Sequence, residues 1–94
     1  MKVSIRFFAA LREIVGKKEE TIDFPEDRNV DVGKVLKQLA KLHGQDFTEY
    51  VYDAQTGAVH GYLQILVNEK IAKGLTINLK DGDVLAIIPP VGGG

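Results

Sequence analysis

The sequence contains no cysteine, so the chain can form no disulfide, offer no thiolate to a metal and supply no cysteine nucleophile. Its two histidines, His43 and His60, are far apart in the sequence and do not form a metal-binding motif. Its one serine, Ser4, falls in an alternating run with no histidine nearby, which gives little support for nucleophilic catalysis. The "GKK" at 16–18 lacks the rest of a phosphate-binding loop. We therefore expect no metal site and no self-contained active site.

Charge and hydropathy argue against two further classes of protein, those that bind nucleic acid and those that span a membrane. The 12 Lys and Arg and 13 Asp and Glu give a net charge of -1, and the basic residues are scattered, so no nucleic-acid-binding patch is predicted. No apolar run approaches the roughly 20 residues of a membrane span, and no charged-then-apolar leader precedes "MKVSIRFF". We expect a cytoplasmic protein that binds neither nucleic acid nor membranes.

The first part of the chain predicts two strands around a short helix. In "KVSIRFF", Val3, Ile5 and Phe7 share one face, while the polar face also contains Phe8. The next segment, "AALREIVG", consists mostly of good helix formers and closes on Gly16. The run "KEETIDFP" alternates again and ends at its proline, which cannot donate to a strand pair.

The stretch "NVDVGKVLKQLAKLHG" predicts the main helix. Asn29 or Asp31 serves as its N-cap, and Gly44 stops it. Its lysines are expected to face water. An apolar stripe at helical spacing comprises Val32, Val35, Leu36, Leu39 and Leu42.

The remaining sequence is less regular at first and then returns to strands. Residues 45–61 are compatible with a short helix or an irregular strand, followed by a turn in "DAQTGAV". "YLQILVNEKIA" predicts a strand, a tight turn around Asn68 and Glu69, and a short return strand. "LKDGDVLAII" predicts an Asp-Gly turn, rather than a calcium loop, and a last apolar strand.

These elements together predict an α+β fold of the β-grasp type. A helix with one apolar stripe and a sheet with one apolar face bury each other, which gives a mixed four- to five-stranded sheet packed on one main helix. The first and last strands should then lie side by side and parallel in the middle of the sheet. We expect a domain at residues 1–88 and a flexible C-terminal Gly tail at residues 89–94.

Two features are not explained by folding. If Leu85 and Ile87 point into the core, Ile88 points outward beside Phe8, and a contiguous apolar patch of this kind marks a partner site. The alternative is that the short helix covers Phe8. The second feature is the glycine run Gly92, Gly93 and Gly94, which loses much conformational entropy on ordering, so it is either idle or used for its bare backbone.

Three segments are similar to a known family. "VSIRFFAALREIVG", "LVNEKIA" and "LKDGDVLAIIPPVGGG" resemble the MoaD-like small subunit of molybdopterin synthase, a sulfur carrier of the ubiquitin-like β-grasp superfamily. The resemblance spans nearly the whole chain. The sequence departs from the family at Gly92, where Ser, Thr or Ala is more usual, and this should loosen the tail.

The resemblance implies a function in molybdenum or tungsten cofactor biosynthesis. An E1-like adenylating enzyme would activate the carboxylate of Gly94 with ATP, and a sulfur donor would convert it to a thiocarboxylate. The large subunit of molybdopterin synthase would accept the tail and contribute the catalytic residues, so this chain would bind no cofactor itself. The resemblance also assigns partner contacts to Phe8, Ile71, Ile88, Pro89, Pro90 and Val91.

Three alternatives remain open at this point. The chain could be a ubiquitin-like modifier joined through Gly94 to lysines of other proteins, or both a modifier and a carrier. It could be the sulfur carrier of the thiazole pathway, although the Pro-Pro-Val before the glycines argues against this. It could also be a plain interaction module with an idle tail.

Overall fold

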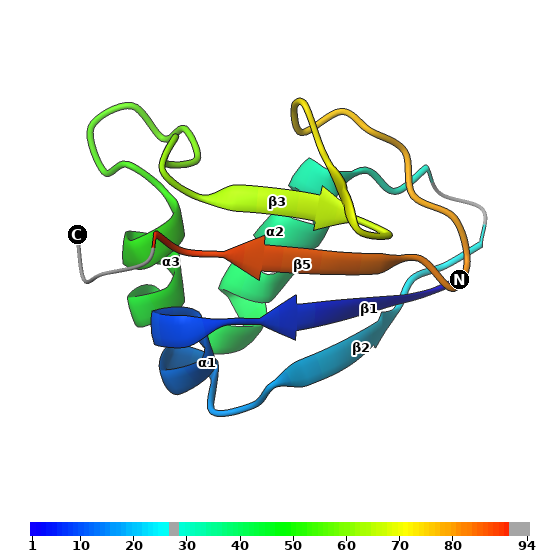
Figure 1. Cartoon of the computed structure of the whole chain (residues 1–94), viewed down its shortest axis with the longest axis horizontal. Helices are drawn as coiled ribbons and strands as arrows, with labels where there is room; N and C mark the ends of the chain where they lie inside the picture. Colours follow the sequence, from blue (N-terminus) through cyan, green and yellow to red (C-terminus); the bar gives the residue numbers. More distant parts are fainter. Residues whose placement is uncertain (27–28, 91–94) are drawn as a thin grey trace.

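The computed structural model describes residues 1–26 and 29–90, and in this part of the chain five strands and three helices form one layered domain (Figure 1). In chain order the elements are β1 (Lys2–Phe7), α1 (Ala9–Val15), β2 (Glu19–Asp23), α2 (Val32–His43), α3 (Gln45–Val51), β3 (Gln64–Val67), β4 (Lys70–Ile71) and β5 (Val84–Ile88). Within these residues, no helix has the length and apolar character needed to cross a membrane.

The sheet has the order β2-β1-β5-β3-β4, with β5 at its centre. Strands β1 and β5 pair in parallel, with Ser4 opposite Val84 and Phe7 opposite Ile87, whereas β3 pairs antiparallel with β5. The prediction that the first and last strands lie side by side and parallel in the middle of the sheet is confirmed.

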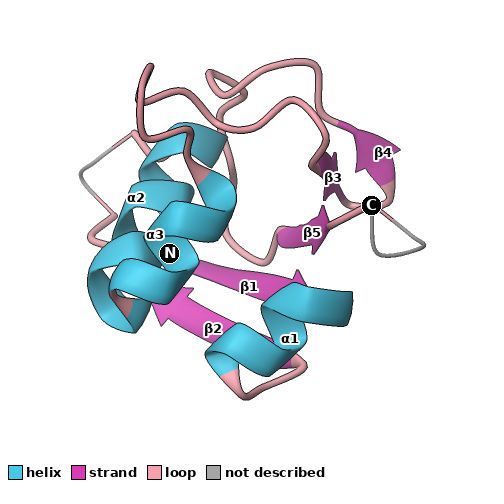
Figure 2. Cartoon of the chain, turned by 90° about the vertical axis from the view of Figure 1, so that its left-hand side faces the viewer, coloured by secondary structure: helices cyan, strands magenta, loops and turns pink. Residues whose placement is uncertain are grey.

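One face of the sheet is covered by helices and forms the core. Val3, Ile5 and Phe7 of β1 and Leu85 and Ile87 of β5 are fully buried there, as the alternation predicted. Figure 2 shows α2 and α3 on one side of the sheet and the short α1 beside the end of β1, so that most of the other face has no helix over it. The arrangement is an α+β β-grasp fold with a five-stranded mixed sheet.

Helix α2 begins and ends where its caps require. The Asp31 carboxylate accepts a hydrogen bond from the backbone N–H of Lys34 at 2.9 Å, and this satisfies one of the free donors of the first turn. At the other end Gly44 has φ 81°, a value that favours glycine. Of the two predicted caps, Asp31 is the one in use.

The predicted apolar stripe of α2 is wrong at its last position. Val32, Val35, Leu36 and Leu39 are buried, but Leu42 is 53% exposed. Successive residues of an α-helix are rotated by about 100° around the helix axis. Position 43 therefore projects within roughly 20° of the direction of Val32, whereas position 42 projects about 80° away from it. His43 therefore continues the buried stripe, and its side chain is 13% exposed.

His43 connects the end of α2 to strand β2. Its Nε2 lies 2.6 Å from Oε1 of Glu20, whose other oxygen accepts from Lys17 at 3.1 Å. Burial alone would raise the pKa of Glu20, but the hydrogen bonds and positive charges of His43 and Lys17 outweigh it and lower that pKa. The imidazole ring also packs edge-on against Phe7, so its role here is structural.

Residues 45–61 begin with a helix, which resolves the alternative left open by the sequence. Phe47 and Val51 of α3 are fully buried in the core. The chain then turns at Asp53, whose carbonyl accepts from Gly57, before an isolated bridge joins Tyr52 to Val59. The turn predicted in "DAQTGAV" is confirmed.

Candidate functional site: an apolar groove on the open sheet face

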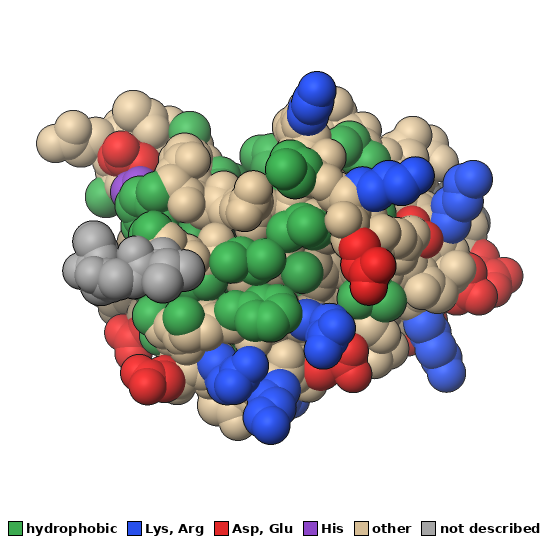
Figure 3. All heavy atoms as spheres, viewed as in Figure 1, with side chains coloured by type: hydrophobic (Ala, Val, Ile, Leu, Met, Phe, Trp, Pro, Cys, Tyr) green, Lys and Arg blue, Asp and Glu red, His purple; other side chains and the backbone are tan. Residues whose placement is uncertain are grey.

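The uncovered face of the sheet contains a groove of about 470 Å³, which we call the docking groove. Figure 3 shows hydrophobic side chains gathered on this face over the central strands. Its floor consists of Phe8, Leu66, Val84, Ala86 and Ile88. Its polar borders are formed by Arg6, Asn68 and Glu69.

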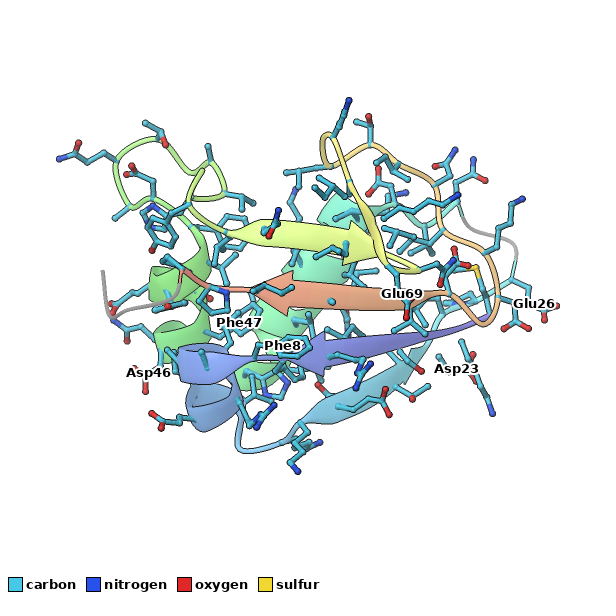
Figure 4. All side chains as sticks on the ribbon, in the orientation of Figure 1. Phe8, Asp23, Glu26, Asp46, Phe47 and Glu69 are labelled. Atoms are coloured by element: carbon cyan, nitrogen blue, oxygen red, sulfur yellow. The ribbon has the colours of Figure 1, made fainter. Side chains whose placement is uncertain are left out.

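Strand pairing explains why these residues meet. Ala86 of β5 lies opposite Arg6 of β1 on one side and opposite Leu66 of β3 on the other. Because successive side chains alternate between faces, the residues two positions along, Phe8 and Ile88, project from the same face as this row. Figure 4 shows Phe8 on the face turned toward the viewer.

Basic side chains border the groove on the β1–β2 side (Figure 3). The guanidinium carbon of Arg6 lies 5.9 Å from the centre of the Phe8 ring, and its Nε is 4.0 Å from Glu19. Arg6 and Phe8 also line an adjoining cavity of about 240 Å³ together with Arg12 and Lys18. A partner that fills the docking groove would therefore meet Arg6 beside the apolar floor, and one that extends into the adjoining cavity would also meet Arg12, Lys18 and Glu19.

The opposite border is held by a rigid turn between β3 and β4. Asn68 and Glu69 both have positive φ, 49° and 72°, which is uncommon for residues other than glycine. The Asn68 amide compensates for this, because it donates to Asp83 at 2.9 Å and accepts from the backbone N–H of Val84 at 2.9 Å. Glu69, next to Asn68 in this turn, lies at the border of the groove (Figure 4).

The "DGD" segment is a turn, as the sequence predicted. Asp81 accepts from the backbone N–H of Lys2 at 2.7 Å, and Asp83 accepts from the backbone N–H of Lys80 at 2.8 Å. Gly82 has φ 86°. Asp81 thus attaches this turn to β1, and Asp83 attaches it to the β3–β4 turn through Asn68.

The structure brings only part of the predicted partner surface together. Phe8 and Ile88 line the docking groove, and both are partly buried. Ile71 is 60% exposed and lies opposite Leu66 on β4, so it shares this sheet face but does not line the groove. Because Phe8 is only partly buried and lines the groove, the short helix α1 does not cover it completely.

The predicted tail begins within the folded domain. Pro89 is buried and Pro90 is partly buried, so both follow directly from the central strand β5. Val91, Gly92, Gly93 and Gly94 lie outside the described residues.

Sequence reasoning did not assign to the site the residues that complete the groove, Leu66, Val84, Ala86, Arg6, Asn68 and Glu69. Alternation along β5 indicated that Val84 and Ala86 face outward with Ile88, and this signal was available. The contribution of Leu66 depended on knowing that β3 neighbours β5, which periodicity does not give.

The groove offers apolar area with charged borders, which is the character of surfaces that bind a partner. Together with the fold, it defines a small ubiquitin-like β-grasp protein with an open sheet face.

Comparison with known proteins assigns the family. The model of the ThiS family matches residues 5–94, and the chain therefore belongs to that family. It is 33% identical to small archaeal modifier protein 3 of Haloferax volcanii over the full length of both chains. It is also 28% identical to the molybdopterin synthase sulfur carrier subunit of Dictyostelium discoideum, over 96% of this chain and 93% of that protein.

Solved structures agree with this assignment. The crystal structure of SAMP1 from Haloferax volcanii superimposes with a TM-score of 0.87 at 28% identity, and covers both chains completely. A structure of the complex of subunits 1 and 2 of the molybdopterin-converting factor from Helicobacter pylori matches with a TM-score of 0.64 at 26% identity, again over both full chains. A member of this fold is thus found in complex with a second subunit.

Proposed function

We propose that this chain is the sulfur carrier of a molybdopterin synthase, with the carboxylate of Gly94 as the group that carries sulfur. The observation that supports this best is the position of the docking groove. Ile88 lines the groove and is also the last residue of β5, so a partner held there would lie beside the start of the glycine segment. The similarity to the Dictyostelium sulfur carrier subunit points in the same direction.

The chemistry requires two partner steps. In the first, the Gly94 carboxylate attacks the α-phosphorus of ATP on an E1-like enzyme, and pyrophosphate leaves. In the second, sulfur at the oxidation level of sulfide, supplied as hydrosulfide by a donor, attacks the acyl carbon, its proton passes to solvent, and AMP leaves to give a thiocarboxylate. The described residues contribute no group to these bonds, because the groove lacks a nucleophile and serves for recognition.

The glycine segment suits delivery into another protein. Residues 91–94, if extended, span about 13 Å at 3.3–3.6 Å per residue. Glycine has no side chain, so a narrow channel in the large synthase subunit could admit it. The buried Pro89 would hold the start of this segment fixed relative to the groove.

Mass spectrometry tests the proposal. Incubation with the E1-like enzyme, ATP and a sulfur donor should exchange one oxygen for sulfur, and the gain should map to the C-terminal peptide. A variant with one residue added after Gly94 should gain no sulfur at Gly94, because its Gly94 carbonyl is an amide. Sulfur mapped to Gly94 of the extended variant, or none on the native chain with active partners, would refute the proposal.

A second candidate is supported by the small archaeal modifier proteins. The 33% identity to small archaeal modifier protein 3 favours a function in which Gly94 is joined to lysines of other proteins. Both functions share the adenylation step and differ in the acceptor. Lysine-linked conjugates in cells, in place of sulfur transfer to the large synthase subunit, would select the modifier.

A further inference from the structure

Strand β2 is an edge of the sheet with free backbone groups. Phe7 donates to the carbonyl of Lys18 and Phe24 donates to that of Met1, so the even-numbered residues of β2 face β1. Antiparallel pairing alternates, and the backbone N–H and C=O groups of Glu19, Thr21 and Asp23 therefore point to the open side. Such an edge can accept one further strand.

A second groove, which we call the β2 edge groove, lies against helix α2 where the chain leaves β2 at Phe24. It has a volume of about 190 Å³. It is lined by Phe24, Asn29, Val30, Lys34, Lys37, Gln38 and Lys41. Buried Val30 and half-buried Phe24 give it an apolar floor.

One wall of this groove is cationic. Lys34, Lys37 and Lys41 occur at spacings of three and four, so they share a face of α2 and span about 10 Å along its axis. The ammonium group of Lys34 donates to the carbonyl of Asn29 at 2.7 Å. None of the ion pairs in the described part of the chain involves Lys37 or Lys41.

The acidic residues of β2 do not cancel this charge. Glu19 and Asp23 lie opposite Arg6 and Lys2, whose positions face the other side of the sheet. Glu20 does face α2, but its carboxylate is already paired with His43 and Lys17. The helix side of the edge is therefore positive, whereas on the other side Glu19 and Asp23 are already paired with Arg6 and with the N-terminal ammonium group.

The same charges argue against a second copy of this chain as the occupant. Antiparallel pairing of two β2 strands about Thr21 would place Glu19 of each copy opposite Asp23 of the other. Like charges directly opposite each other destabilise a strand pair. The occupant should instead bring acidic groups to α2.

We propose that the β2 edge groove binds an extended acidic peptide of another protein, which adds a strand to β2. Every second side chain of the added strand would face α2, and these side chains are spaced about 7 Å apart. Acidic side chains among them would contact the lysines of α2, and an apolar side chain would contact Phe24 and Val30. This site lies at the sheet edge, whereas the docking groove lies on the open face between β1 and β3. Both can be occupied together, and the proposal does not depend on sulfur transfer.

The test uses the full chain and the synthetic peptide acetyl-Thr-Asp-Thr-Val-Thr-Asp-Thr-amide. Titration followed by amide NMR should slow hydrogen exchange at Glu19, Thr21 and Asp23. Thr21→Pro removes one outward N–H at an edge position that tolerates proline and should abolish binding, whereas Thr21→Ala keeps that N–H and should retain it. Thermal unfolding of both variants checks that they are folded.

Charge reversal tests the cationic wall. The double variant Lys37→Glu, Lys41→Glu should weaken peptide binding at least fivefold, and the matched double variant Lys73→Glu, Lys80→Glu should not. Equal binding by the proline and alanine variants would overturn the added strand. Equal affinity for inorganic polyphosphate of the same charge would show that the site binds polyanions in general. A β2-mediated dimer in sedimentation would show that the occupant is a second copy of this chain. Either result would overturn the proposal.

Discussion

Phe7 and Phe8 are adjacent in sequence but face opposite sides of the sheet, and replacing each by alanine separates folding from recognition. Phe7 is fully buried in the core. Phe8 is partly buried in the docking groove. We expect Phe7→Ala to impair stability and Phe8→Ala to impair partner binding.

The magnitudes follow from these positions. Removing a fully buried phenylalanine ring costs about 3–5 kcal/mol, a large part of the roughly 5–14 kcal/mol expected for a domain of this length. Phe8→Ala leaves no cavity in the core and removes a contact with an exposed arginine worth up to about 1 kcal/mol. With about 4–8 °C per kcal/mol, Phe7→Ala should lower Tm by at least about 12 °C and Phe8→Ala by less than about 8 °C.

Binding to the E1-like enzyme completes the experiment. If Phe8 is a central anchor, Phe8→Ala should weaken the complex by about 2 kcal/mol, a factor of about 30, and Ile88→Asp should do at least as much. Leu42→Ala is the matched control, because Leu42 is an exposed apolar residue on a helix of the opposite face. The reasoning would be refuted if Phe8→Ala unfolded the chain as Phe7→Ala does, or if Leu42→Ala weakened binding equally.

Three further predictions concern stability. His43 and Lys17 lower the pKa of Glu20 below its ordinary value of 4.5. The contribution of Glu20 to the free energy of unfolding is therefore present above about that pH and is lost as the pH falls through the folded-state pKa. In urea unfolding, Glu20→Gln should lose less stability below about pH 4.5 than the native chain does. Asn68→Ala should lower the free energy of unfolding by about 2 kcal/mol in denaturant, because it loses two hydrogen bonds and places alanine at positive φ. Asn68→Gly loses the same bonds without the backbone strain and should recover part of this stability. Equal losses in the two variants would show that the backbone is not strained. Removal of Gly92–Gly94 should leave Tm within about 2 °C in calorimetry, since glycine buries no side chain, and a large drop would mean that the segment is structural.

Much of the fold could be predicted because strand alternation and helix periodicity report burial directly. Val3, Ile5 and Phe7 were placed in the core from their spacing alone, and all are fully buried. The parallel pairing of β1 and β5 followed from the order of elements, since a sheet that grips one helix leaves few other arrangements.

Other features depended on tertiary contacts. Helix periodicity places position 43 inside the buried stripe of α2 and position 42 at its margin, but an apolar stripe does not predict a histidine, and His43 is accommodated there by its ion pair with Glu20 on β2. Helix α3 is held by burial of Phe47 and Val51, and a seven-residue segment is too short for its own periodicity to be decisive.

The candidate site was predicted in outline. Phe8 and Ile88 were expected to share a surface, and they do line one groove. Leu66, the floor residue that β3 contributes, could not be predicted. Chain topology, and not local sequence, determines that β3 lies beside β5.

The central position of β5 has a consequence for synthesis of the protein. Ser4 pairs with Val84, so the contacts that join the two halves of the sheet close a loop of about 80 residues. Within the sheet, the β1–β2 pair and the β3–β4 pair are joined through β5 alone. On the ribosome, neither strand pair can complete the core until residues 84–88 have emerged. An enzyme that recognises the docking groove would consequently meet only chains whose translation has passed Ile88, because an unfinished chain has no groove to present.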